Sequence, residues 1–81
     1  MAEIWNYETI KELLYAPGLG HYFTYGLLAA RKINAAWEPV EFIHDVTTDY
    51  LLVKKMEELF NRYQLYPIHL RDAIEDMLCL L

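Results

Sequence analysis

Three side chains near the C-terminus have the types and the spacing that acid–base or metal chemistry needs. His69, Asp72 and Asp76 lie at positions i, i+3 and i+7, so one face of a helix would carry all three. An imidazole with two carboxylates can bind a divalent metal ion or transfer a proton. His44 and Asp45 are the obvious source of a further ligand. We nevertheless expect structural roles, because His69 and Asp72 fall where a helix begins and can bond its exposed N–H groups.

Nucleophilic catalysis has less support than acid–base chemistry. The chain has no serine, and Cys79 is its only cysteine. A reactive thiol needs positive charge nearby, whereas the charges nearest to Cys79 in sequence are Glu75 and Asp76. We therefore predict that the protein is not an enzyme, has no catalytic residues, and holds no metal and no cofactor.

Aromatic residues give the stronger signal. The chain has 81 residues, seven of them Tyr and two Trp, and 56% of its residues are hydrophobic. A chain this short buries only roughly 60–65% of its unfolded surface. Its apolar surface therefore exceeds what one small core hides, unless the rings simply fill that core, and a protein partner or a second copy would cover the remainder. We predict a partner-binding surface made of Trp37, Tyr25, Tyr50, Tyr66, His69 and Asp72.

The charge balance narrows the class of partner. Seven basic and twelve acidic residues give a net charge of −5, and basic residues never form a run longer than a pair. Direct nucleic-acid binding needs a basic stripe and is disfavoured. An acidic surface suits a basic partner instead. We expect no signal peptide, and the uncharged segment from Ala16 to Ala30 is short and broken by Pro17 and glycines. We expect a cytoplasmic protein with no membrane partner.

The first half of the chain predicts one helix and two strands. Asn6 can cap a helix over residues 6–16, which Pro17 ends. Residues 21–31 and 39–46 favour antiparallel strands, because aromatic and β-branched residues open the first and the second alternates apolar with acidic side chains. Because Leu27 to Lys32 would also suit a helix, an all-α fold is the alternative.

The second half predicts two helices. Leu52, Met56, Leu59 and Tyr63 recur at helical spacing, which indicates a helix over residues 48–63. Pro67 suits the first position of a last helix, in which Leu70, Ala73, Ile74 and Met77 share a face. The short connection predicts an αα-hairpin. We therefore predict one α+β domain over residues 1–81, in the order α-β-β-α-α, with the β-hairpin packed on the C-terminal αα-hairpin.

The segment from Asn61 to Asp76 also resembles a known signature. It fits the pattern N-x-x-x-L-x-P-x-H-L-x-D-x-x-E-D at Asn61, Leu65, Pro67, His69, Leu70, Asp72, Glu75 and Asp76. That pattern is similar to the C-terminal signature of a family of short, mostly clostridial bacterial proteins of unknown function. The resemblance implies a β-hairpin followed by two helices and carries no activity. The chain departs from the family at Tyr66, where a small capping residue is expected, and at residues 6–16, where the family is expected to have a strand.

Three hypotheses of function follow. The leading one is a non-enzymatic protein-binding module that acts through an aromatic, acidic surface, with a homodimer as one form. The second is an inhibitor encoded by a phage or mobile element, which would imitate nucleic acid in the basic groove of a host defence or nucleic-acid enzyme. The third is a divalent-metal-binding protein centred on His69, Asp72 and His44.

Overall fold

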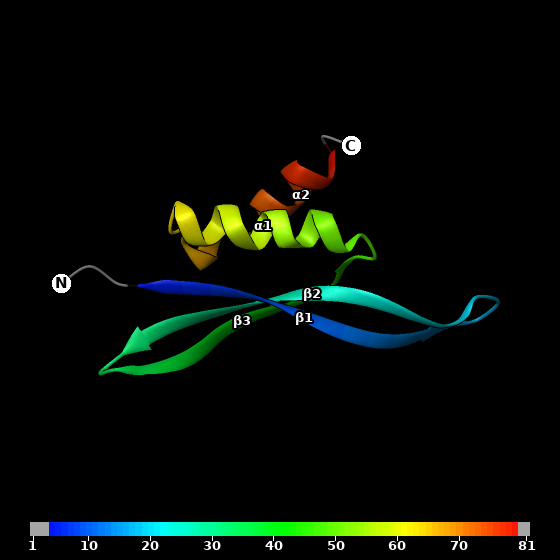
Figure 1. Cartoon of the computed structure of the whole chain (residues 1–81), viewed down its shortest axis with the longest axis horizontal. Coiled ribbons are helices and arrows are strands. Elements are labelled where there is room, and N and C mark those ends of the chain that lie inside the picture. Colours follow the sequence, from blue (N-terminus) through cyan, green and yellow to red (C-terminus); the bar gives the residue numbers. More distant parts are fainter. Residues whose placement is uncertain (1–3, 80–81) are drawn as a thin grey trace.

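The computed structural model describes residues 4–79, which form a twisted sheet with both helices on one face (Figure 1). The three strands are β1 (Trp5–Ala16), β2 (Gly20–Ile33) and β3 (Ala36–Thr47). They are antiparallel neighbours in the order β1-β2-β3. The chain continues into α1 (Tyr50–Arg62), the short 3₁₀ turn η1 (Pro67–His69) and α2 (Leu70–Cys79). The fold is therefore α+β, in the order β-β-β-α-α.

The predicted first helix is wrong, because residues 6–16 lie within β1. Ile10, Leu13 and Leu14, which would share one face of a helix, are divided between the two faces of the strand, since alternation places Leu13 on the face of Trp5 and Tyr7 and the other two on the opposite face. The helix-favouring residues of this segment are a weak local preference. Tertiary packing outweighs it, because Trp5 and Tyr7 are buried under the helices only when the chain is extended. The strand expected from the family resemblance is the one observed.

The other elements agree more closely with the prediction. Both predicted strands are present and are longer than expected, so the all-α alternative is wrong. The predicted helix over residues 48–63 is α1, and Asp49 caps it by accepting a hydrogen bond from the N–H of Leu52 at 3.2 Å. The last helix begins three residues later than predicted, because Pro67 opens a 3₁₀ turn first.

The core lies between the sheet and the helices. Its buried side chains are Trp5, Tyr7, Leu27 and Ala29 from the sheet, Val53, Met56 and Phe60 from α1, and Leu70 and Ile74 from α2. Tyr7 is at its centre, with 1% of its surface exposed. The Tyr7 ring meets Phe60 edge to face at 5.5 Å, and its hydroxyl donates to the carbonyl of Leu65 at 2.6 Å. Burial, assisted by the charge of Glu41, raises the pKa of the Tyr7 hydroxyl to about 12.

The β1–β2 hairpin continues beyond the start of α1. The ring of Tyr50, the first residue of α1, packs on Tyr25 at 5.3 Å, and Tyr25 pairs with Lys11 of β1. The hairpin past this point, residues 11–25, projects as a two-stranded arm (Figure 1). We call it the arm. A turn at Pro17–Leu19 closes it, with Gly18 and Gly20 at φ values of 82° and 80° that suit glycine.

Within residues 4–79, neither helix has the length and apolar character needed to cross a bilayer.

Candidate protein-binding surfaces

Side chains of helix α1, and of Gln64 just after it, bond the backbone along the outer edge of β1. Asn61 accepts from the N–H of Tyr7 at 2.7 Å through Oδ1 and donates to the Tyr7 carbonyl at 3.0 Å through Nδ2. Gln64 makes the same pair of bonds to Trp5: its Oε1 accepts from the Trp5 N–H at 2.9 Å, and its Nε2 donates to the Trp5 carbonyl at 3.1 Å. A residue of a neighbouring antiparallel strand makes the same pair of bonds. The two amides therefore take the place of a fourth strand and close this part of the edge.

Glu57 continues the same row of contacts. Its Oε1 accepts from the N–H of Thr9 at 2.7 Å, and its Oε2 binds the ammonium of Lys54 at 2.6 Å. Burial would raise the pKa of the Glu57 carboxyl, but the hydrogen bonds from Lys54 and Thr9 outweigh it and hold that pKa below its ordinary value. The charged form of Glu57 is therefore the one that fits this edge.

The sequence analysis missed this row, although its spacing is visible in the sequence. Glu57, Asn61 and Gln64 lie at i, i+4 and i+7 of the helix. Four helical residues advance about 6 Å, which matches the roughly 6.6 Å between outward N–H groups on a strand. A polar row at this spacing beside apolar helix positions is the signal that could have identified it.

A hollow lies between the start of η1 and the sheet. It encloses about 280 Å³ and is lined by Trp5, Arg31, Val40, Tyr66, Pro67 and Ile68. Its floor includes the Trp5 ring, on which the Tyr66 ring packs at 5.9 Å. At its mouth Ile68 is 83% exposed, which is unusual for an isoleucine. The hollow therefore offers an apolar cavity with an apolar rim on an otherwise acidic protein.

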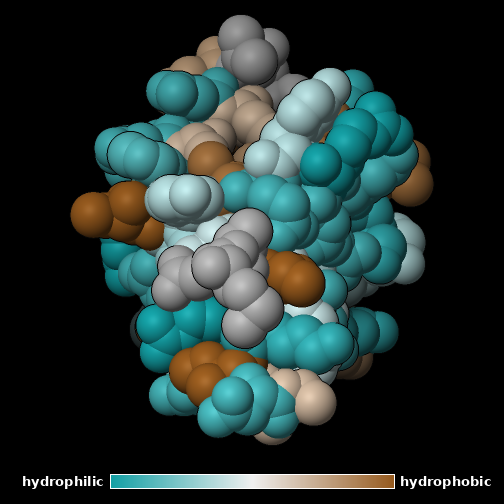
Figure 2. Space-filling view, turned by 90° about the vertical axis from the view of Figure 1, so that its left-hand side faces the viewer, coloured by the Kyte–Doolittle hydropathy of each residue, from teal (hydrophilic) through white to brown (hydrophobic). Residues whose placement is uncertain are grey.

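Ion pairs border this hollow. Arg31 lies 3.9 Å from Glu38 on β3, and Arg71 at the start of α2 lies 3.4 Å from Glu41. Figure 2, which views this end of the molecule, shows apolar residues as separate patches among hydrophilic ones. An apolar centre with polar surroundings is the usual composition of a protein–protein contact.

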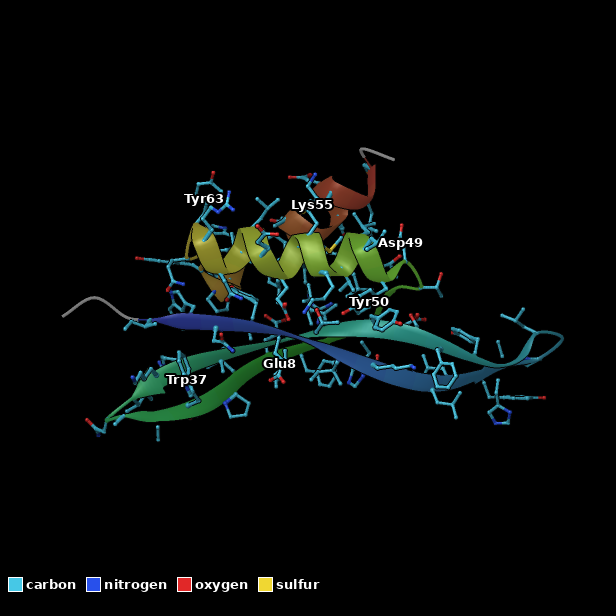
Figure 3. All side chains as sticks on the ribbon, in the orientation of Figure 1. Glu8, Trp37, Asp49, Tyr50, Lys55 and Tyr63 are labelled. Carbon is cyan, nitrogen blue, oxygen red and sulfur yellow. The ribbon has the colours of Figure 1, made fainter. Side chains whose placement is uncertain are left out.

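The predicted partner-binding residues do not form one surface. Tyr25 and Tyr50 contact each other at the base of the arm. Tyr66 lines the hollow, and the N–H of His69 bonds its carbonyl. Trp37 lies far from Tyr50 along the sheet (Figure 3), with the ammonium of Lys32 5.9 Å from its ring centre.

The remaining predicted residue, Asp72, is exposed in the first turn of α2. Four large apolar side chains of the arm are exposed but were absent from the prediction, namely Leu13, Tyr15, Leu19 and Phe23. Their exposure depends on the arm projecting past the helices, which the predicted first helix concealed.

The residues proposed for a metal site are not brought together. His44 bonds Glu12 through Nδ1 at 2.6 Å instead, while His69 and Asp72 are exposed on the helical side. Burial would raise the pKa of Glu12, but hydrogen bonds from the N–H of Asp45 and from His44 lower it below its ordinary value. Within residues 4–79, no three His, Cys, Asp or Glu side chains gather closely enough to hold a metal ion.

The signature residues divide into structural and exposed ones. Asn61 closes the edge of β1, the Leu65 carbonyl accepts from Tyr7, and Leu70 is fully buried. His69, Asp72, Glu75 and Asp76 are exposed. Among the residues that fit the resembled pattern, some therefore fix η1 and α2 against the sheet and the others are exposed.

Comparison with known proteins gives one match. No curated protein and no solved structure is similar enough to this chain to count as a relative. One family profile, described as a family of unknown function (DUF6514), matches residues 2–80, which is nearly the whole sequence. The chain therefore belongs to the family of unknown function DUF6514.

Proposed function

We propose that this protein is a non-enzymatic, cytoplasmic protein-binding module, and that the hollow beside η1 receives an apolar side chain of its partner. The observation that carries the proposal is the exposure of Ile68 and Tyr66 at the mouth of an apolar cavity. Leaving such side chains in water has no structural benefit, and binding energy in protein contacts concentrates where an anchor enters a pocket.

The size and borders of the hollow favour a protein over a small molecule. Its volume of about 280 Å³ lies at the lower limit for small-molecule sites and suits one or two side chains. The pairs Arg31–Glu38 and Arg71–Glu41 offer both charges to a partner backbone or to its polar side chains. The exposed half of the signature, His69 and Asp72 included, lies directly beyond Ile68 in the chain and would extend the contact.

From the family resemblance we also propose that the protein is of clostridial origin and that the pattern from Asn61 to Asp76 is a signature of its family. The proposed partner is an enzyme with a basic nucleic-acid groove, which suits the net charge of −5. Binding to such an enzyme would weaken steeply with salt.

Selection from a displayed random peptide library tests the proposal. We expect the protein to select peptides that share an aromatic or aliphatic anchor. We expect Ile68→Glu to weaken binding of a selected peptide at least about tenfold, because it places a charge at the mouth of the hollow.

The matched control is Leu51→Glu. Leu51 is 79% exposed, close to the exposure of Ile68, but lies at the opposite end of α1 from η1. This variant should bind the peptide as the wild type does. Selected peptides without a common anchor, or equal binding by Ile68→Glu and the wild type, would contradict the proposal.

A further inference from the structure

The outer edge of β1 changes character at Lys11. Pairing with β2 is uninterrupted from Trp5 to Ala16, so every second residue directs its N–H and carbonyl away from β2. The N–H groups of Trp5, Tyr7 and Thr9 point outward, because Gln64, just after α1, and Asn61 and Glu57 of α1 accept them. The same alternation directs those of Lys11, Leu13 and Tyr15 outward. No acceptor within residues 4–79 reaches these three N–H groups.

The arm that carries this open edge is poorly supported by its own contacts. A two-stranded hairpin is marginally stable in water, and three or more strands are needed for a sheet to stand alone. Leu13, Tyr15 and Phe23 share its helix-side face, and each is more than half exposed. Open backbone groups beside exposed apolar side chains form a template for another strand.

The other edges of the sheet are less suited to strand addition. Pro39 and two register shifts interrupt β3, so its outward N–H groups do not form a regular row. On the β2 side of the arm, only His21 and Phe23 direct their N–H groups outward, because β3 pairs with β2 from Tyr25 onward. Residues 11–15 of β1 are the regular stretch that remains.

We infer that a second copy of this chain pairs with residues 11–15 of β1, antiparallel and about a two-fold axis at Leu13. This pairing does not involve the hollow and goes beyond the proposed function. Leu13 would lie opposite Leu13 of the second copy, and Lys11 opposite Tyr15. Each of these pairs exchanges two N–H···O bonds, so all three open residues are satisfied at once.

The residues themselves select this register. An axis at Lys11 would oppose two lysines, which is unfavourable across a strand pair. An axis at Tyr15 would bring Pro17, which has no N–H, opposite Leu13. An axis at Glu12 would oppose two glutamates and place Tyr15 opposite Thr9, where Glu57 already occupies the edge. An axis at Leu14 would bring Pro17 opposite Lys11. With the axis at Leu13, Pro17 lies opposite Thr9, where Glu57 already occupies the edge, and the pairing ends there.

The paired arms would form one four-stranded antiparallel sheet. Side chains opposite each other share a face, so Leu13, Tyr15 and Phe23 of both copies would gather on the helix side. The ammonium of Lys11, which lies 4.2 Å from the centre of the Phe23 ring, would also lie beside Tyr15 of the second copy. The two copies therefore complete for each other the sheet that one arm lacks.

Substitution of Leu13 by residues of opposite charge tests the pairing in the full chain. We expect the wild type to be a dimer by sedimentation equilibrium. Leu13→Lys and Leu13→Glu should each raise the dimer dissociation constant at least about tenfold, because each opposes like charges across the axis. An equimolar mixture of the two variants should regain dimers, and native mass spectrometry should show that they are mixed. Leu13 is 57% exposed, so both variants should remain folded by circular dichroism.

Leu19→Lys is the matched control, because Leu19 is 68% exposed but lies in the turn outside the paired segment. It should leave the dimer intact. A wild type that stays monomeric, a Leu13→Lys variant that still dimerises, or variants that do not restore each other on mixing would overturn the inference. Dissociation by Leu19→Lys would also overturn it, because the contact would then lie at the tip.

Discussion

The two halves of the outer edge of β1 present the same backbone groups, but only the first half is covered. From Trp5 to Thr9 the side chains of α1, with that of Gln64 just after it, take the place of a neighbouring strand. From Lys11 to Tyr15 the edge is open. Element length explains the difference, since a helix of 13 residues spans about 20 Å and a strand of 12 residues spans about 40 Å. A helix of this length can cover only half of such a strand, so the rest must project.

The largest expected effect comes from removing the amide that closes the first half. Asn61→Leu keeps the approximate shape of the side chain but leaves the buried N–H and carbonyl of Tyr7 without partners. We expect the free energy of unfolding to fall by about 2–4 kcal/mol, as measured by urea denaturation. Arg62→Leu, on the exposed side of the same helix, should change it by less than about 0.5 kcal/mol. Equal stabilities of these two variants would show that the amide contributes nothing.

Proline substitution compares the two halves directly. Thr9→Pro removes an N–H that donates to Glu57, whereas Leu13→Pro removes an N–H with no partner in the described chain. Proline is tolerated in edge strands where its missing N–H would face solvent. We expect Thr9→Pro to be more destabilising than Leu13→Pro by about 1–3 kcal/mol, in thermal denaturation at concentrations where the chain is monomeric. A smaller cost for Thr9→Pro would reverse the assignment of closed and open halves.

The smallest expected effect is a dependence on pH at the closed half. The pKa of Glu57 is lowered in the folded protein. Its stabilising contribution is therefore complete above the ordinary carboxyl pKa of about 4.3, and it is lost as the pH falls through the folded value. We expect the unfolding free energy of the wild type to decline over this acidic range, and that of Glu57→Gln to decline less. Chemical denaturation between pH 3 and pH 6 measures how the unfolding free energy of each protein changes with pH. Equal changes in the two proteins would show that Glu57 does not cause the pH dependence.

Much of the helical half of the fold was predictable from sequence. The apolar period from Leu52 to Tyr63 predicts α1, and the position of Pro67 predicts the last helix to within the three residues of η1, because both depend on local patterns. The first strand was not predictable in this way. Its Glu and Lys residues favour a helix locally, and the partners that hold it extended lie 48 to 59 residues further along the chain.

The candidate surfaces were predictable only in part. Tyr66 was predicted as part of an exposed aromatic surface, and it does line the hollow. The other walls come from Trp5 on β1, Arg31 on β2 and Val40 on β3, and only the register of the sheet brings these residues together. The exposure of Leu13 likewise follows from the relative lengths of a strand and a helix rather than from any local pattern.

The bonds from Asn61 to Tyr7 also determine what happens while the chain is being made. The two residues are 54 positions apart, so β1 emerges from a ribosome well before the helix residue that shields it. Throughout that interval the whole length of β1 is exposed to other nascent chains, at the stage when strand edges aggregate most readily. Rapid translation of residues 48–64, or protection by a chaperone until they appear, should therefore improve the yield of the protein in cells.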